Sequence, residues 1–202
     1  YLGLCSLIDA WVGRIIEVLK ERGLYDNTVI LFTTDHGDLL GDHGLVYKQC
    51  FYEQSVRAPL IWHAAGRFPA GRSGAMVESI DIFNTLCELG GASPGPGRQG
   101  RSILPLLEDP LKRGNHRQAA FSENYFGRMV RHENWKMVYY PGKPSGELYD
   151  LASGPDEQDN LWEKLEGSPI KHQLKDLLLE WVFTTEDDEV PAPVRPGHQD
   201  PA

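Results

Sequence analysis

Apolar residues near the start of the chain recur at steps of three and four, which predicts an amphipathic helix with one buried stripe. The stripe consists of Leu4, Leu7, Ile8, Trp11, Ile15, Val18 and Leu19. Gly23 stands where this helix should end. The following apolar run in "TVILFTT", residues 28–34, is unbroken and predicts a strand covered on both faces, as in a parallel sheet. Helix, turn and buried strand together indicate an α/β fold.

The second half of the chain has a different pattern. Short segments at 119–123, 128–131, 135–140 and 146–151 predict strands, the middle two joined as a hairpin. Ser168 and Pro169 begin a predicted helix that can lie on that sheet. Its apolar side consists of Ile170, Leu174, Leu177, Leu178, Trp181 and Val182. Further upstream, Asp81 is placed to cap a helix whose apolar side is Ile82, Phe83, Leu86 and Leu89.

These patterns predict three parts of the chain. Residues 1–115 form an α/β part, and residues 116–184 form a small α+β subdomain in which a helix packs on an antiparallel sheet. Residues 185–202 are rich in acidic side chains and proline, so we expect a flexible tail.

Composition limits the partners that the protein can have. With 41% hydrophobic and 24% charged residues, the chain can form a packed core. The net charge of −9 and the absence of a basic stripe argue against nucleic acid or an anionic membrane as partner. No apolar run approaches the length of about 20 residues that spans a membrane. Three widely spaced cysteines, Cys5, Cys50 and Cys87, predict no disulfide framework.

The candidate chemistry follows the strand at 28–34 directly. Asp35, His36 and Gly37 lie at its carboxyl end, where ligands bind in α/β sheets. A carboxylate and an imidazole form a plausible half-set of ligands for a divalent cation. Neighbouring strand residues point to opposite faces, so both can reach one ion only where the backbone leaves strand geometry, which Gly37 permits. The alternative is an ordinary solvated loop.

Lys48 follows this segment after the loop "GDLLGDHGL". A lysine beside a metal can hold the anionic oxygens of a sulfuryl or phosphoryl group, although a surface charge is the simpler reading. Arg57 is expected to form a structural ion pair with Glu53 rather than to bind an anion.

The run "NTVILFTTDHGDLLGDHGLVYKQCFYEQSVRAPLI" resembles the second signature region of the sulfatases, in the alkaline-phosphatase-like superfamily. Further stretches resemble the family in the same order, among them "SLIDAWVGRIIEVLKERG", "SIDIFNTLCELGGA", "GRSILPLLED" and "RMVRHENWKMVYYP". The resemblance covers most of the chain. It implies part of a mixed, mostly parallel sheet with flanking helices, followed by a small C-terminal antiparallel sheet packed with a helix. On this reading residues 1–115 are the C-terminal part of the catalytic domain, whose N-terminal part is absent.

The resemblance also implies roles for particular residues. Asp35 and His36 match metal ligands, and Lys48 matches the lysine that contacts the transferred anionic group. Many relatives have Asn where this chain has His36, and the Asp-His version is similar to choline-sulfatase-like and phosphonate-monoester-hydrolase-like members. Calcium is the first expectation for the ion, with manganese or another transition metal as the alternative. His43 either touches the substrate and its leaving group or bonds within the loop.

The nucleophile of the family is a Cys oxidised to formylglycine, or a Ser, in a C-x-P-S-R-like motif. None of the cysteines present has that context, Cys50 included, so we expect the nucleophile upstream of Tyr1. The remaining histidines are expected to be structural or on the surface: His63, His116, His132, His172 and His198.

The implied function is hydrolysis of a small anionic sulfate ester by a sulfuric ester hydrolase. A phosphonate monoester or phosphodiester hydrolase on the same scaffold is the alternative, and a sulfatase-like protein without catalysis is a third possibility. The chain alone is expected to be inactive and to bind a divalent cation weakly. A homo-oligomer is possible, and the residues indicate neither a compartment nor a particular substrate.

Overall fold

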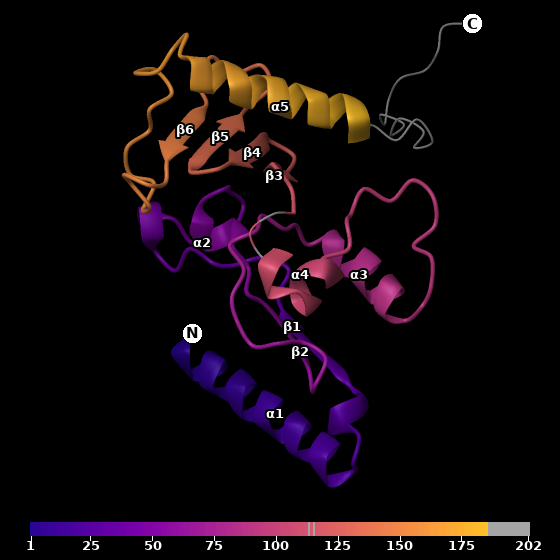
Figure 1. Ribbon diagram of the computed structural model, residues 1–202. Coiled ribbons are helices and arrows are strands. Elements are labelled where there is room, and N and C mark those ends of the chain that lie inside the picture. The colour runs from indigo at the N-terminus through magenta and orange to yellow at the C-terminus, as the bar shows by residue number, and fades with distance from the viewer. Residues whose placement is uncertain (113, 115, 186–202) are drawn as a thin grey trace, which may run out of the picture.

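The structure is a computed structural model that describes residues 1–112, 114 and 116–185 (Figure 1). Its α-helices are α1 Leu2–Glu21, α2 Glu53–Val56, α3 Asp81–Leu89, α4 Leu104–Glu108 and α5 Pro169–Thr185. Short 3-10 helices occur at η1 Tyr25–Asn27, η2 Asp42–Gly44 and η3 Pro110–Lys112. The strands are β1 Val29–Thr33, β2 Leu60–Ala64, β3 Ala119–Glu123, β4 Arg128–His132, β5 Trp135–Tyr139 and β6 Glu147–Asp150.

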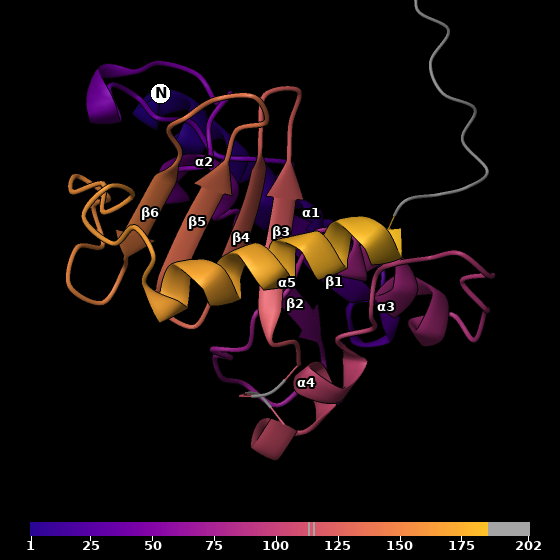
Figure 2. The same cartoon turned by 90° about the horizontal axis from the view of Figure 1, so that it is seen from above.

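The strands predicted for the second half of the chain form one antiparallel sheet in the order β3-β4-β5-β6. Helix α5 crosses one face of this sheet (Figure 2). Leu174 and Leu178 of α5 join Val130 and Met137 of the sheet in a buried apolar core, because these positions repeat with the helical and strand periods. The predicted sheet and its covering helix are confirmed.

The opposite face of the same sheet packs on the segment that contains α2. Since side chains alternate along a strand, Met129 and Val138 point away from α5, and they form a second small core with Phe51. The sheet therefore lies between α5 and the α2 segment (Figure 1). This second contact lies near a candidate residue, because α2 follows Lys48 closely in the chain.

The strand predicted at 28–34 is β1, and it pairs antiparallel with β2. Both sheets within the described residues are antiparallel, so the parallel pairing expected for this strand is not observed there. Nor is β1 covered on both faces, since Val29 and Phe32 are each 37% exposed. The α/β class itself is confirmed. An unbroken apolar run indicates that a strand can be covered, but it does not specify its partners.

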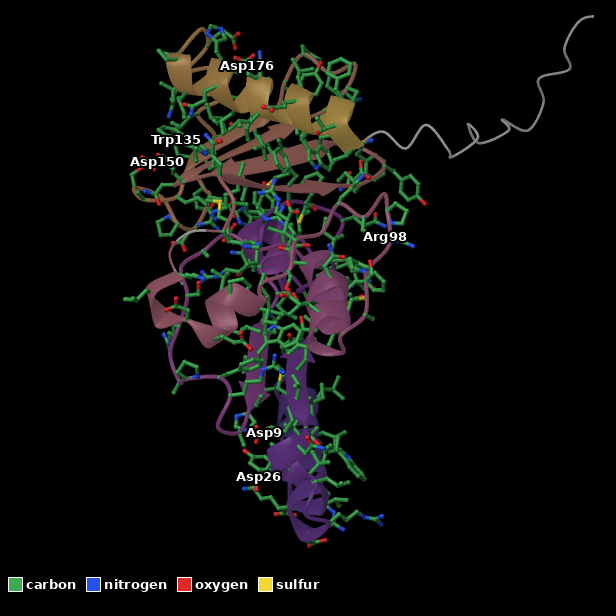
Figure 3. All side chains as sticks on the ribbon, turned by 45° about the vertical axis from the view of Figure 1, so that its right-hand side comes forward. Asp9, Asp26, Arg98, Trp135, Asp150 and Asp176 are labelled. Carbon is green, nitrogen blue, oxygen red and sulfur yellow. The ribbon has the colours of Figure 1, made fainter. Side chains whose placement is uncertain are left out.

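Helix α1 forms as predicted, and Gly23 ends it in a left-handed conformation with φ +64°. The buried stripe is wrong for the described residues: Leu4 is 63% and Trp11 is 61% exposed, and no residue of α1 is buried. Figure 3 places Asp9 of α1 at the opposite end of the molecule from α5. Periodicity identifies a face that is able to pack, but not whether a partner covers it.

The role predicted for Asp81 is also wrong. The residue before α3 has no side-chain cap, and Asp81 lies inside the first turn with 0% exposure. Its carboxylate accepts the backbone N–H groups of Glu78 at 2.8 Å and Arg101 at 2.7 Å, and it forms an ion pair with Arg117. Asp81 thus joins three segments of chain instead of capping one helix.

The apolar side predicted for α3 is not the side that the fold buries. Phe83 and Leu86 are 51% and 47% exposed, whereas Thr85 is fully buried. The Thr85 hydroxyl donates to the carbonyl of Asp81 and accepts the N–H of Ile103, so a buried polar group is satisfied on both sides.

The division into 1–115, 116–184 and 185–202 stays a prediction. Except for Thr185, which ends α5, the tail lies outside the described residues. In the part of the chain that the structure describes, no helix is both long enough and apolar enough to cross a bilayer.

Candidate metal and anion site

The turn after β1 brings two candidate metal ligands together. Strand geometry ends at Thr33, and His36 Nε2 then lies 3.1 Å from the Oδ2 atom of Asp35. The other carboxylate oxygen of Asp35 accepts the Thr34 hydroxyl at 3.1 Å and the backbone N–H of His36 at 3.0 Å. The Thr34 hydrogen bond is the main cause that lowers the pKa of Asp35 below its usual value. Asp35 is therefore an anion at neutral pH.

Gly37 allows this turn to pack closely against Gln54 of α2. It does not adopt the left-handed conformation that glycine makes accessible, and a Cβ atom there would lie 1.9 Å from the carbonyl oxygen of Gln54. Its N–H donates to the carbonyl of Ser55 at 2.8 Å. Only glycine allows the turn to dock this closely on α2.

The hydrogen bonds of His36 determine which of its ring nitrogens carries the proton. Nδ1 lies 2.8 Å from the carbonyl oxygen of Gly37. Because a carbonyl can only accept, Nδ1 donates, and Nε2 of the neutral ring presents a lone pair. The Nζ atom of Lys48 lies 2.5 Å from that Nε2. Asp35, His36 and Lys48, which were predicted to act together, therefore meet at one point.

The donor atoms fit a divalent cation. Two ligand atoms that lie about 2.2 Å from one transition-metal ion, at right angles, are about 3.1 Å apart. This matches the separation of 3.1 Å between Asp35 Oδ2 and His36 Nε2. The described residues contain no group of three or more His, Cys, Asp or Glu side chains placed to hold a metal. Asp35 and His36 are the two candidate ligand groups among them.

The loop that carries Lys48 is anchored on both sides. The Ser55 hydroxyl donates to the carbonyl of Lys48 at 2.8 Å, and the N–H of Leu39 donates to the carbonyl of Tyr47 at 2.9 Å. Leu39 and Ser55 are each 2% exposed, so these anchors are buried. Tyr47 has φ +72°, a left-handed conformation that costs a non-glycine residue free energy and that the anchors maintain. The lysine head itself remains exposed.

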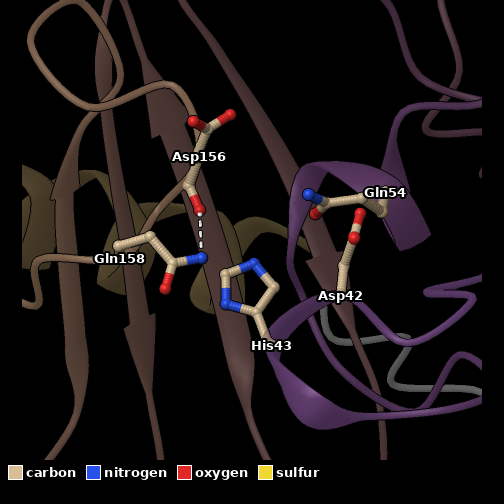
Figure 4. A pocket seen from close by; sticks show the side chains of 5 residues that line it. All are labelled: Asp42, His43, Gln54, Asp156 and Gln158. Atoms are coloured by element: carbon tan, nitrogen blue, oxygen red, sulfur yellow. Dashed lines mark hydrogen bonds between the residues drawn. The ribbon is translucent and has the colours of Figure 1, made fainter.

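His43 lines a separate pocket and not the site formed by Asp35, His36 and Lys48. Its ring stacks on Tyr52 with centroids 3.7 Å apart and planes 6° apart, and its Nε2 atom is buried without a hydrogen-bond partner. The pocket, about 190 Å³ in volume, is lined by Asp42, His43, Gln54, Asp156 and Gln158 (Figure 4). The three residues of the metal and anion site do not belong to this lining. A role of His43 toward substrate stays a prediction.

Of the other described histidines, His172 is exposed, and the ring of His63 lies against Tyr25 with centroids 5.1 Å apart. His116 lies 3.5 Å from the Asp81 carboxylate, and burial lowers the pKa of His116 below its usual value. His132 contacts the carbonyl of Gln118 at 3.0 Å and the amide of Gln173 at 3.1 Å. His198 lies outside the described residues. Cys5, Cys50 and Cys87 are free thiols.

The ion pair predicted between Arg57 and Glu53 is wrong. The Glu53 carboxylate pairs instead with Lys136 at 2.6 Å and with Arg131 at 2.9 Å, both on the C-terminal sheet. Burial works to raise the pKa of Glu53, but the charges of Lys136 and Arg131 outweigh it and lower the pKa. Arg57 is near in sequence, whereas the fold brings the other two cations into contact.

Sequence reasoning missed Lys136 and Glu157, which complete this cluster. Both side chains have 0% exposure and their charged atoms lie 2.7 Å apart. The available signal is a lysine between apolar residues in the strand "WKMVY". A charge at such a position is either solvated at an edge or paired inside.

Comparison with known proteins identifies the family of the chain. Residues 41–183 match the family described as "N-sulphoglucosamine sulphohydrolase, C-terminal". Arylsulfatase K of Gallus gallus is 32% identical over 174 residues, which are 80% of this chain and 32% of that protein.

Two solved structures have the same fold. One is BT4656 in complex with its substrate D-glucosamine-2-N,6-O-disulfate, with a TM-score of 0.84 and 28% identity over 94% of this chain and 41% of that one. The other is the phosphonate monoester hydrolase of Agrobacterium radiobacter, with a TM-score of 0.76 and 27% identity over 91% of this chain and 40% of that one.

The fold of the chain is the alkaline-phosphatase-like architecture. The chain belongs to the sulfatase family. It spans about a third of the length of the curated relative and about two fifths of the two solved chains.

Proposed function

We propose that this chain supplies part of the active site of an enzyme that hydrolyses sulfate esters to an alcohol and sulfate. The observation that carries the proposal is the meeting of three groups: Asp35 Oδ2 and Lys48 Nζ lie 3.1 Å and 2.5 Å from the same atom, His36 Nε2. An anion, an imidazole lone pair and a cation at one point can bind a divalent metal and an anionic ester together.

The residues have separate roles in this proposal. The carboxylate of Asp35 and the Nε2 lone pair of His36 hold the metal, while Gly37 keeps the imidazole tautomer that leaves this lone pair available. The metal, calcium in the first place and manganese or another transition metal as the alternative, supplies positive charge that polarises the ester. Lys48 contacts the sulfuryl oxygens and offsets the negative charge that develops on them. The nucleophile, which we expect to be a formylglycine, comes from outside this chain.

His43 has a supporting role in the proposal. Its ring lines the polar pocket described above and stacks on Tyr52. From there it can contact the leaving group or another part of the substrate. Sulfated sugars are the first substrates to assay, since the substrate named for BT4656 is a glucosamine disulfate.

The alternative is a phosphonate monoester hydrolase that uses the same residues. It is favoured by the similarity to the Agrobacterium radiobacter enzyme, because sulfate and phosphonate esters present similar tetrahedral oxyanions. The test is a parallel assay of the full polypeptide that carries this chain on an aryl sulfate and an aryl phosphonate monoester. A higher kcat/KM for the sulfate supports the proposal, and the reverse order supports the alternative. Turnover of neither ester, with metal bound, favours a sulfatase-like protein without catalysis.

A further inference from the structure

Helix α2 touches the candidate site on one side. Through Ser55 it accepts the N–H of Gly37 and donates to the carbonyl of Lys48, both at 2.8 Å. The carbonyl oxygen of Gln54 lies where a side chain on Gly37 would otherwise be. The turn that carries the two metal-ligand candidates and the loop that carries Lys48 are therefore both fixed to this helix.

On its other side the helix is fixed to the C-terminal sheet by buried charges. Lys136, on β5, has 0% exposure, and its Nζ atom lies 2.6 Å from Glu53 Oε1 and 2.7 Å from Glu157 Oε1. It also donates to the carbonyl of Phe51 at 2.9 Å. Lys136 thus contacts both Phe51 and Glu53, the two ends of the short connection that leads into α2.

Glu157 closes this cluster from a third segment. Its Oε2 atom accepts the backbone N–H of Glu53, the first residue of α2, at 2.7 Å. Glu157 has φ +52°, which is unfavourable for a residue other than glycine. The two contacts of its carboxylate maintain this conformation.

Buried charges at this place fix the position of α2 more than they add to stability. A buried ion pair contributes little net stability compared with apolar residues of the same volume, but it fixes direction and distance. Helix α2 has only four residues, fewer than are needed to hold a helix by its own hydrogen bonds. Its position therefore depends on the groups at its two sides.

We propose that Glu53, Lys136 and Glu157 form a positioning cluster through which the C-terminal sheet sets the location of Lys48 and of the Asp35–Gly37 turn. This inference rests on the proposed role of Lys48 toward the anionic group. The three residues are positioning residues and touch no substrate.

The test uses Glu157→Gln in the full polypeptide, with Val130→Ala as matched control. The first variant keeps an acceptor for the N–H of Glu53 but removes one charge from Lys136. The control weakens the same sheet from the face that packs on α5. For each variant, kcat, KM and the acetylation rate of Lys48 are measured, the last by mass spectrometry relative to Lys20.

We expect Glu157→Gln to lower kcat about tenfold with KM nearly unchanged, since small misplacements at a reacting centre cost rate. Lys48 should be acetylated faster than in wild type. Val130→Ala should change none of the three measured quantities beyond its effect on the folded fraction. Unchanged Lys48 acetylation in Glu157→Gln, or the same change in both variants, overturns the inference.

Ser55→Ala gives a second test that keeps the charged cluster intact. It removes the hydroxyl that binds the carbonyl of Lys48, and we expect faster acetylation of Lys48 here too. If Glu157→Gln does not fold, an unchanged rate in Ser55→Ala overturns the inference. Wild-type turnover of Lys48→Ala would instead contradict the proposed function, and the acetylation result is independent of that outcome.

Discussion

The Nε2 atom of His36 lies 2.5 Å from the Nζ atom of Lys48. Since Nδ1 of His36 donates to the carbonyl of Gly37, Nε2 has one lone pair, which can be used by the lysine or by a metal, but not by both. If His36 held a metal, the Lys48 ammonium would be free to turn toward an anionic ester. This relationship makes the roles of ligand and lysine separable by mutation.

Asp35→Ala should remove the bound metal and nearly all turnover from the full polypeptide. The change deletes the anionic ligand and leaves the imidazole to hold the ion alone. Metal content is measured by elemental analysis after gel filtration. Asp38→Asn is the control, because it removes a charge from the same loop but keeps an acceptor for the N–H of Leu40. Wild-type metal content in Asp35→Ala would refute the ligand assignment.

Lys48→Ala should leave the metal bound and lower kcat by roughly a hundredfold, the usual cost of removing a group that stabilises charge in the transition state. Steady-state kinetics and metal analysis on the same preparation check this. Lys112→Ala, which removes an exposed lysine elsewhere, should behave as wild type. Normal kinetics of Lys48→Ala would make this residue an ordinary surface charge.

His43→Asn should lower kcat/KM by about tenfold, the effect of losing one contact with substrate. Asparagine tolerates the left-handed backbone at this position, where φ is +55°, so the turn is preserved. Tyr52→Phe keeps the stacking partner and serves as control. Unchanged kinetics would assign the ring to packing in the loop.

The stability contributed by Glu53 should depend on pH. Lys136 and Arg131 lower the pKa of Glu53 below its ordinary value of 4.5, so the contribution is fully present above that pH and is lost as pH falls through the folded-state value. Glu53→Gln should destabilise by about 3 kcal/mol at pH 7. The difference from wild type should shrink progressively below pH 4.5, as measured by urea unfolding.

Glu88→Gln, at an exposed position, is the control. It should change stability by less than about 0.5 kcal/mol both at neutral and at acidic pH. A Glu53→Gln effect that is equal at neutral and acidic pH would mean that the ion pairs do not contribute.

The isolated chain should bind a divalent cation weakly and hydrolyse no aryl sulfate. The described residues contain no group of three or more possible ligands, and Asp35 and His36 are two candidates, whereas calcium takes about six to eight oxygen ligands. Isothermal titration with calcium and with manganese measures the affinity. Hydrolysis of an aryl sulfate by the purified chain, abolished by a chelator, would require a nucleophile within it, and Cys50 would be the first candidate.

Local pattern in the sequence determined the elements. The steps of three and four in α1 and α5 and the short strands β3 to β6 follow from contacts between near neighbours, so they could be predicted. The candidate residues Asp35, His36 and Lys48 were also identified from the sequence, because one short segment carries them and resembles the sulfatases. The structure brings their side chains together, while their roles as metal ligands and as anion contact stay proposals.

Tertiary structure decided which partners these elements and side chains have. The apolar stripe of α1 is exposed, and β1 pairs antiparallel with β2, although their sequence patterns suit buried helix and parallel strand. Glu53 pairs with cations of the distant sheet rather than with Arg57, and its N–H is bound by a residue 104 positions away. Periodicity reports only which face of an element can pack. Contacts between residues so far apart in the chain depend on the free energy of the whole fold, and local sequence does not specify them.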